Sequence, residues 1–516
     1  MYIKKMREKV LVNIFKICCI VVFGGLTFYS FIQTGYSPFD LSSEAISFKS
    51  DNWIVNLLFV LGVVAVLFVL LQCVNKVQTK INTRFLAIGA AFLSVAVSLL
   101  WVAGSNIAPV ADQSNVLYYA WAFNEGIFSG FDKGKYVATC PHQLGMISIL
   151  RIMYYVLGNR PNPYLGFQVI SAVCVGILVY AGYELVRNIS KRNVFAELIY
   201  LLLAVVCFPL YAYTPFVYGE IPSTALLFVG AWALLSAMEQ MKGYKLFALA
   251  VCCGLAVQLR QNSLIVLVGF VVLLVVKLIQ QFNWRYLALI ATIFIGFCCS
   301  NVIIDAMYHE HYQEDAHAIP NILYITMGTN WEEGNPGLFS GYNYTVFFEN
   351  DCDPEAASQV ALRDLGLFVQ KCLDDKAYAV DFLGQKILAQ WNEPMYHCLV
   401  MNQNIQYEQF PIIADIYFGP LRSVVEEYMN IYQLIIYGSI LGLFILNFKK
   451  WEKIEPFALM IGIFGGFLFT IIWEAKTRYV FPYFIMMLPY AAVGLQRIIN
   501  KLDVAFRDIF YKTVRK

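Results

Sequence analysis

Long apolar stretches, separated by short polar segments, run along most of the chain. A membrane-spanning helix needs about 20 mostly apolar residues, and twelve stretches fit that length alone or as part of a pair. The stretch 246–258 is short, but it pairs with 263–280 across Arg260, Gln261 and Asn262. The pattern predicts an all-α polytopic membrane protein with about twelve transmembrane helices. The predicted spans are 10–32, 53–75, 85–103, 164–186, 195–213, 222–241, 246–258, 263–280, 286–307, 431–448, 456–473 and 479–498.

Two polar segments are too long to be simple turns. Segment 308–430 holds 18 acidic and five basic residues, and we predict a small external domain there, with a helix over 354–378 that starts after Asp353. Segment 104–163 is predicted to be an external loop. Its apolar piece 142–157 carries a histidine and an arginine, so we expect an amphipathic helix on the membrane surface, with a further span as the alternative. The chain thus divides into a transmembrane core with its external loop (1–307), an external domain (308–430), and C-terminal helices with a basic tail (431–516).

Lysine and arginine mark alternate ends of the predicted spans. Short cytoplasmic loops are enriched in these residues, and all the marked ends fall on one side if both termini are cytoplasmic. We therefore predict a multi-pass protein of the plasma membrane with both termini inside and segments 104–163 and 308–430 outside. The marking residues are Lys4, Lys5, Arg7, Lys9, Lys76, Lys80, Arg84, Arg187, Lys191, Arg192, Lys242, Lys245, Arg285, Lys449, Lys450, Lys453, Arg497, Lys501, Arg507, Lys512, Arg515 and Lys516.

The composition excludes several classes of protein. The chain is 59% hydrophobic and 14% charged, unlike a soluble or disordered protein, and its net charge of +2 argues against a nucleic-acid partner. It carries no P-loop, GxGxxG, CxxC or HExxH motif, which disfavours an ATPase or a dinucleotide enzyme. Nine of the 13 cysteines lie in predicted spans, and the external Cys352, Cys372 and Cys398 leave a disulfide open. For three neighbouring histidines, His309, His311 and His317, a solvated loop is favoured over a metal site.

Polar residues gather at the predicted outer ends of the spans, whereas the inner loops carry simple basic residues. Ionisable groups at a membrane are costly and usually functional, so this asymmetry indicates an active site that faces outward. Each residue also has a structural interpretation. Glu220 favours the start of a helix, and Glu474 and Arg478 are spaced to pair on one helix face. The gathered residues are Asp112, Gln113, His142, Gln143, Glu220, Arg260, Glu474, Lys476, Arg478 and Tyr479.

Four motifs, in this order and with this sidedness, resemble a known family. They are ADQSNVLYYAWAF in an external loop, the basic turn ELVRNISKR, the acid before a proline in YGEIPS, and the late WEAKTRYVFPYFIMMLPYAAVGL. Together they are similar to the GT-C glycosyltransferases of the family 39 type, which include protein mannosyltransferases and lipid A aminoarabinose transferases. The chain departs from that pattern by having Gln113 where the family often has Glu, and by two additional spans before the usual first helix.

The resemblance implies a GT-C-like helical bundle that moves a sugar from a polyprenyl-phosphate donor to a hydroxyl on a glycan, lipid or protein outside the membrane, with inversion at the sugar. The residues fit these roles independently. A hydroxyl acceptor needs a base, for which Asp112 is the candidate, and Arg260, Lys476 and Arg478 can bind the donor phosphate. No cofactor is predicted beyond a divalent cation, which is left open. Candidates for the acceptor, the sugar or that cation are Glu220, His142, Gln143, Glu474 and Tyr479.

Two other function classes stay open. A multispanning transporter or a flippase for lipid-linked sugars would place ionisable groups near the middle of the membrane, whereas here they gather at one face, which favours the enzyme. A non-catalytic relative would bind glycans through the aromatic residues of 308–430, although such residues also pack the core of a small domain. Those residues are Trp331, Tyr342, Tyr344, Phe347, Phe348, Trp391 and Tyr396.

Overall fold

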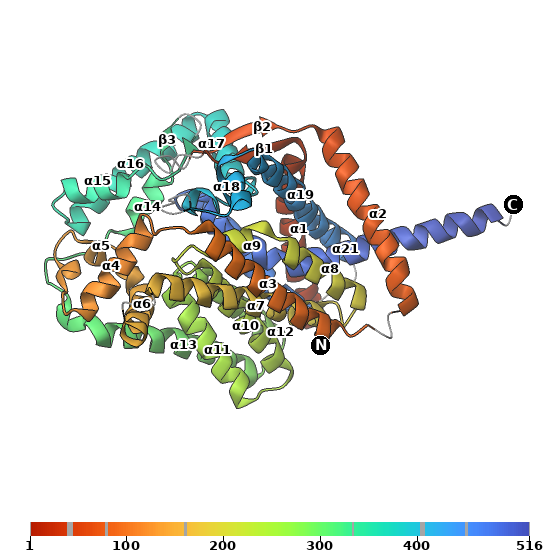
Figure 1. The fold of residues 1–516 in the computed structure, drawn as a ribbon, viewed down its shortest axis with the longest axis horizontal. Helices are drawn as coiled ribbons and strands as arrows, with labels where there is room; N and C mark the ends of the chain where they lie inside the picture. Colours follow the sequence, from red (N-terminus) through yellow and green to blue (C-terminus); the bar gives the residue numbers. More distant parts are fainter. Residues whose placement is uncertain are drawn as a thin grey trace.

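A computed structural model describes residues 2–38, 45–77, 81–158, 162–332, 335–402, 408–448 and 453–514. The described chain is mainly α-helical, with two short antiparallel strand pairs, β1 (Gln33–Tyr36) with β2 (Ser47–Ser50) and β3 (Trp331–Glu332) with β4 (Asn335–Pro336). Figure 1 shows α4 to α6 and α14 to α16, from the two segments predicted to be external, at one end of the molecule, while the end of α21 projects at the other.

Ten of the described helices are long and apolar enough to cross a membrane, and two shorter apolar helices accompany them. Each predicted span coincides with one of these twelve, so the polytopic helical membrane class is confirmed, while the number that cross stays a prediction. The long helices are α1 (Tyr2–Ile32), α2 (Trp53–Val77), α3 (Thr83–Ser105), α7 (Pro163–Ile189), α10 (Glu220–Glu239), α12 (Ser263–Gln280), α13 (Trp284–Tyr308), α19 (Leu421–Asn447), α20 (Ala458–Ile472) and α21 (Thr477–Val514), and the short ones are α8 (Val194–Val206) and α11 (Gly243–Leu259).

One predicted span is shorter than expected. The prediction placed a single helix over 195–213, but α8 ends at Val206 and a separate short helix, α9 (Phe208–Ala212), follows Cys207. Pro209 explains the break, because proline lacks the N–H that a continuous helix needs and clashes with the preceding turn. The break turns the chain toward the polar loop that precedes α10.

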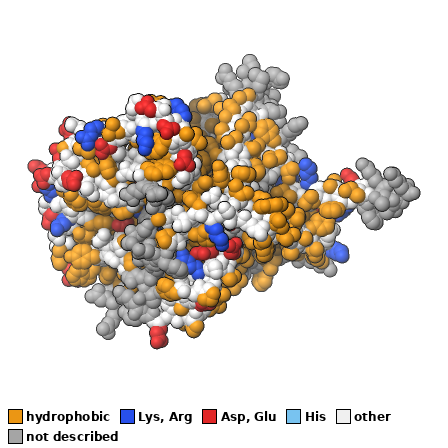
Figure 2. Space-filling view, turned by 90° about the horizontal axis from the view of Figure 1, so that it is seen from above, with side chains coloured by type: hydrophobic (Ala, Val, Ile, Leu, Met, Phe, Trp, Pro, Cys, Tyr) orange, Lys and Arg blue, Asp and Glu red, His pale blue; other side chains and the backbone are white. Residues whose placement is uncertain are grey.

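Helix α21 forms the centre of the bundle and packs against α19, α20, α8 and α7. Its residues from Val480 to Val493 are almost all buried. Helices α2 and α13 lie at the periphery with large hydrophobic side chains exposed, as lipid contact requires. Figure 2 shows hydrophobic side chains over much of the visible face.

Side-chain contacts join helix ends that were predicted to share the inner face. Arg84 at the start of α3 lies 3.7 Å from Glu184 near the end of α7, and Lys277 at the end of α12 lies 2.7 Å from Glu455 before α20. These contacts fit the predicted alternation of spans, and which face is cytoplasmic stays a prediction. The basic residues Lys80, Lys449, Lys450, Arg515 and Lys516 lie outside the described residues.

Segment 104–163, which we call the external loop after its predicted position, folds into short helices. They are α4 (Asp112–Asn124), a 3-10 turn η2 (Ser129–Phe131), α5 (Tyr136–Thr139), a 3-10 turn η3 (Pro141–Gln143) and α6 (Leu144–Leu157). Helix α6 has 14 residues and is therefore about 21 Å long, shorter than the roughly 30 Å of a bilayer core. Its length does not decide whether it crosses, since α8, which lies in one of the predicted spans, has 13 residues.

Segment 308–430, which we call the external domain after its predicted position, contains α14 (Asn321–Met327), α15 (Tyr342–Glu349), α16 (Pro354–Asp374), α17 (Lys376–Trp391) and α18 (Pro411–Phe418). Asp353 caps α16 as predicted, its carboxylate accepting from the backbone N–H of Glu355 and Ala356. The predicted helix 354–378 is too long, because Asp375 accepts from the Tyr378 N–H and so starts α17. This capping hydrogen bond therefore sets the boundary between α16 and α17.

The cysteine side chains of the external domain form no disulfide, and several of its aromatic side chains pack in hydrophobic cores. All 13 cysteines of the chain are described and free, so the disulfide left open among Cys352, Cys372 and Cys398 is not formed. Phe347 belongs to a small core with Leu323 and Ala361. Of the other listed aromatic residues, Trp391 and Tyr396 belong to the main core.

Candidate functional site

A polar cavity of about 590 Å³ opens where the external segments meet the ends of the spans. This volume is within the range of about 300–1,000 Å³ that small-molecule sites occupy. Eight of the nine residues named as catalytic or binding candidates line it, and the ninth, Glu220, lines a narrow adjoining cavity between α10, α12 and α21. The eight are Asp112, His142, Gln143, Arg260, Glu474, Lys476, Arg478 and Tyr479. The structure therefore brings the predicted residues together, while their chemical roles stay predictions.

Glu220 lies beneath two arginines. Its Oε1 is 3.4 Å from Nη2 of Arg260 and 3.7 Å from Nε of Arg478. The Glu220 side chain is 1% exposed, and neither carboxylate oxygen makes a hydrogen bond within the described residues. Two guanidinium groups thus share one carboxylate at the floor of the cavity, a pattern that suits the binding of an anion, while Asp112 and Glu474 supply further negative charge to the lining.

A glycine allows this arrangement. Gly219 has φ +94°, and a Cβ on it would lie 2.5 Å from the carbonyl oxygen of Leu259. Glycine tolerates both the positive φ and the close approach, so the loop before α10 can press against the end of α11. Arg260 follows Leu259 directly, and this contact therefore brings Glu220 to Arg260.

Tyr218 is sandwiched by the same two arginines. Its ring centroid lies 4.8 Å from Cζ of Arg260 and 5.1 Å from Cζ of Arg478, distances at which a cation and an aromatic ring attract. Gln143 donates a hydrogen bond from Nε2 to the Tyr218 hydroxyl at 2.5 Å. Gln143 thus orients the ring that holds the arginines, a role that sequence reasoning did not assign.

Lys476, the third basic candidate, and the carboxylate of Glu474 lie on the loop before α21. The Nζ of Lys476 is 4.5 Å from the ring centroid of Phe339, and Glu474 accepts a hydrogen bond from the Tyr479 hydroxyl. The predicted pairing of Glu474 with Arg478 is replaced, because Arg478 pairs with Glu220 instead. Glu474 and Tyr479 therefore form a unit of their own beside the arginines.

Asp112 is the first residue of α4 and is half-buried on the cavity wall. The Tyr136 hydroxyl donates to its Oδ1 at 3.4 Å. The preceding Ala111 has φ 47°, a sparsely populated conformation for a residue with a side chain. Next to Asp112, the Oε1 of Gln113 accepts from the Val217 N–H at 2.8 Å. Gln113 therefore fastens the start of α4 to the loop that carries Tyr218.

His142 lies in η3 between the two halves of the site. His142 is exposed to the space inside the cavity, but the walls of the cavity place many protein atoms around the ring. This enclosure and the Arg260 guanidinium lower the pKa of His142 to about 4, although Asp112 opposes the shift. At neutral pH the ring is uncharged, so it can both donate and accept a hydrogen bond with a hydroxyl group.

Sequence reasoning missed the residues that roof the cavity. They come from the external domain and from α5, and no local pattern distinguishes them from ordinary loop and core residues. Tyr344 was named as one of several aromatic residues of 308–430, and Cys140 as a member of the polar cluster that contains His142. The roof and wall residues include Tyr136, Cys140, Tyr324, Phe339, Asn343 and Tyr344.

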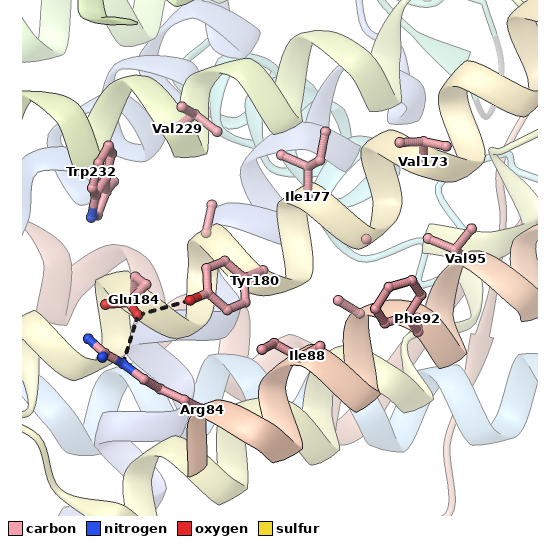
Figure 3. A pocket seen from close by; sticks show the side chains of 13 residues that line it. Arg84, Ile88, Phe92, Val95, Val173, Ile177, Tyr180, Glu184, Val229 and Trp232 are labelled. Atoms are coloured by element: carbon pink, nitrogen blue, oxygen red, sulfur yellow. Dashed lines mark hydrogen bonds and ion pairs between the residues drawn. The ribbon is translucent and has the colours of Figure 1, made fainter. Parts of the chain in front are cut away.

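A second hollow, of about 710 Å³, lies between α3, α7 and α10. Figure 3 shows its lining of aliphatic and aromatic side chains, with Arg84, Glu184 and Tyr180 at one end. The Glu184 carboxylate lies 3.7 Å from Arg84 and accepts from the Tyr180 hydroxyl at 3.5 Å. This hollow lies toward the opposite ends of the spans and has few polar groups, which suits contact with lipid better than catalysis.

The described residues contain no group of three or more His, Cys, Asp or Glu side chains that could hold a metal ion. Glu220 is a poor cation ligand here, since two guanidinium groups already approach its Oε1. His311, one of the three loop histidines, stacks on Phe128 with ring centroids 3.6 Å apart. The geometry therefore favours an anion at the cavity floor.

Comparison with known proteins finds no matching family model, no similar curated protein and no similar solved structure. The function therefore has to be inferred from the chemistry of the cavity itself.

Proposed function

We propose that the protein is an inverting glycosyltransferase of the GT-C type, which transfers a sugar from a polyprenyl-phosphate donor to a hydroxyl acceptor on the external membrane face. The observation that carries the proposal is the pair Arg260 and Arg478 sharing the single carboxylate of Glu220, in the same cavity as Asp112. In this proposal all twelve apolar helices span the membrane and both termini are cytoplasmic.

The arginines suit a phosphodiester at a membrane. Guanidinium groups bind phosphate oxygens with two parallel hydrogen bonds, and burial strengthens their effect. The small cavity between α10, α12 and α21 descends from Arg260 and Arg478 along apolar side chains such as Leu227 and Met486. This cavity, of about 20 Å³, is too narrow for a prenyl chain, so a donor would place its phosphate on the arginines with its prenyl chain directed to the surrounding lipid.

Asp112 suits the acceptor. The carboxylate takes the proton from the acceptor hydroxyl as that oxygen forms its bond to the sugar C1. The bond from C1 to the phosphate oxygen breaks at the same time, and the polyprenyl phosphate leaves with its electron pair and added negative charge. Arg260 and Arg478 stabilise that charge as it develops. A single displacement of this kind inverts the configuration at C1.

The decisive experiment uses the full chain in liposomes with tritiated hexoses on undecaprenyl phosphate. We expect the wild type to release or transfer label, and Asp112→Asn to lower the rate at least 100-fold with unchanged expression and thermal stability. Glu125→Gln is the matched control, since Glu125 is an exposed carboxylate at the other end of α4. Movement of intact donor across the bilayer with no cleavage would instead support the flippase alternative.

A further inference from the structure

The roof of the cavity contains a buried amide without a hydrogen-bond partner. Asn343, on α15 of the external domain, is 0% exposed and lines the cavity. Neither its Oδ1 nor its Nδ2 makes a hydrogen bond to any described residue. The Tyr324 hydroxyl interacts with the amide but does not reach hydrogen-bond geometry. Buried amides are almost always paired, so this one is a site where a ligand completes the bonding.

The part of the roof from segment 308–430 is fixed at two points, to α5 and to the loop before α21. The Ile319 N–H donates to the Thr139 carbonyl at 3.1 Å, and the Ala475 N–H donates to the Gly337 carbonyl at 2.7 Å. Gly337 has φ +71°, and a Cβ there would lie 2.4 Å from the Gly328 carbonyl oxygen. These attachments hold Asn343 in place over the cavity, so its amide is set before a ligand arrives.

The neighbours of Asn343 span the two halves of the site. On one side the Tyr324 ring stacks on Trp473, with centroids 5.3 Å apart, next to Glu474. On the other, the Tyr344 hydroxyl lies 3.4 Å from the Cys140 sulfur and within electrostatic reach of Asp112. The two tyrosines near Asn343 therefore reach toward the candidate base on one side and toward the loop before α21 on the other.

An amide in this position selects the chemistry of its ligand. It offers N–H donors and a carbonyl acceptor side by side, which match two neighbouring hydroxyl groups of a sugar ring. A phosphate could use only the donors, and a prenyl chain could use neither. We infer that Asn343, supplied by the external domain, binds hydroxyl groups of the donor's sugar and makes the cavity discriminate a glycosylated polyprenyl phosphate from the bare lipid. This inference rests on the proposed function.

The experiment measures the affinity of the full chain in detergent, by thermophoresis, for undecaprenyl phosphate and for the same lipid bearing glucose, galactose, mannose or N-acetylglucosamine. We expect at least one sugar-bearing lipid to bind about tenfold more tightly than the bare lipid. Asn343→Ala and Asn343→Leu should remove that preference and leave the affinity for bare undecaprenyl phosphate unchanged. Gln385→Ala, a surface amide of the same domain bonded to Asp381, should keep the preference.

Thermal unfolding separates binding from a structural role. Leucine keeps the branched heavy-atom shape of asparagine, although its methyl groups are larger, and it removes an unpaired amide, so Asn343→Leu should be as stable as the wild type or more stable. Loss of stability together with equal loss of both affinities would overturn the inference, as would a preference that survives in both variants or is absent from the wild type. If the wild type bound neither kind of lipid, the proposed function itself would fail.

Discussion

At the scale of single residues, the most consequential group is the carboxylate of Glu220 between two guanidinium groups. A buried charge that loses its partner is strongly destabilising. Glu220→Gln would leave Arg260 and Arg478 facing each other without compensation, and an anion at the cavity floor would then matter more for stability than it does in the wild type.

We therefore expect Glu220→Gln to lower the free energy of unfolding by about 3 kcal/mol, and undecaprenyl phosphate to raise its melting temperature more than it raises that of the wild type. Glu184→Gln is the matched control, because Glu184 also pairs with arginines, Arg84 and Arg187, but outside the cavity. Equal lipid-induced shifts in all three proteins, measured by thermal unfolding, would count against a phosphate site at the arginines.

At the scale of elements, the site depends on how closely its loops approach one another. The contact of Gly219 with the Leu259 carbonyl sets the distance between α10 and Arg260. We expect Gly219→Ala to reduce donor cleavage at least tenfold, because the added Cβ would push Glu220 away from Arg260. Gly126→Ala shares the cost of a positive φ, yet its Cβ would meet open space. Similar cleavage rates for the two variants would refute this account.

Helix α17 of the external domain carries a buried lysine that makes the stability of the folded protein depend on pH. Lys386 on α17 is 1% exposed and donates from Nζ to the Gly328 carbonyl at 2.5 Å. Burial lowers its pKa from the usual 10.5 to about 7, with Glu474 opposing. Between these values the unfolded chain binds a proton that the folded chain does not, so the free energy of unfolding should rise with pH, by about 2 kcal/mol from pH 7 to pH 9.

Thermal unfolding across this pH range tests the assignment. Lys386→Met should lack the rise, whereas Lys376→Met, which alters an exposed lysine at the start of the same helix, should keep it. A rise of the same size in Lys386→Met would assign the pH dependence to other groups.

At the scale of the whole molecule, the proposed function needs the cavity to face outward. In a variant with its exposed native cysteines replaced, we expect Glu355→Cys in the external domain to react with a membrane-impermeant maleimide in intact cells. Lys242→Cys, in the exposed turn between α10 and α11, should react only after permeabilisation. The reverse pattern, read by gel shift, would invert the topology.

Much of this organisation could be predicted from the sequence, because apolar runs and the positions of charges are local signals. The twelve apolar helices fall where the runs predicted them, and charged residues at their ends converge on one cavity. The role of Gln143 could not be predicted, since it arises from a contact with Tyr218, 75 residues away, and that of Asn343 depends on a cavity lined by residues from Val110 to Tyr479. The break at Cys207 and the start of α17 depended on single residues within otherwise helical patterns.

The pairing of two buried arginines with the single carboxylate of Glu220 also has a practical consequence for handling the protein. Guanidinium groups held side by side in a cavity can bind any anion that fits between them. Protein extracted in mild detergent should carry a lipid phosphate with it through purification, detectable by mass spectrometry of the extracted lipids. Phosphate and sulfate buffers would compete with that lipid phosphate. The choice of buffer therefore decides whether the cavity is isolated with lipid or with a buffer anion bound.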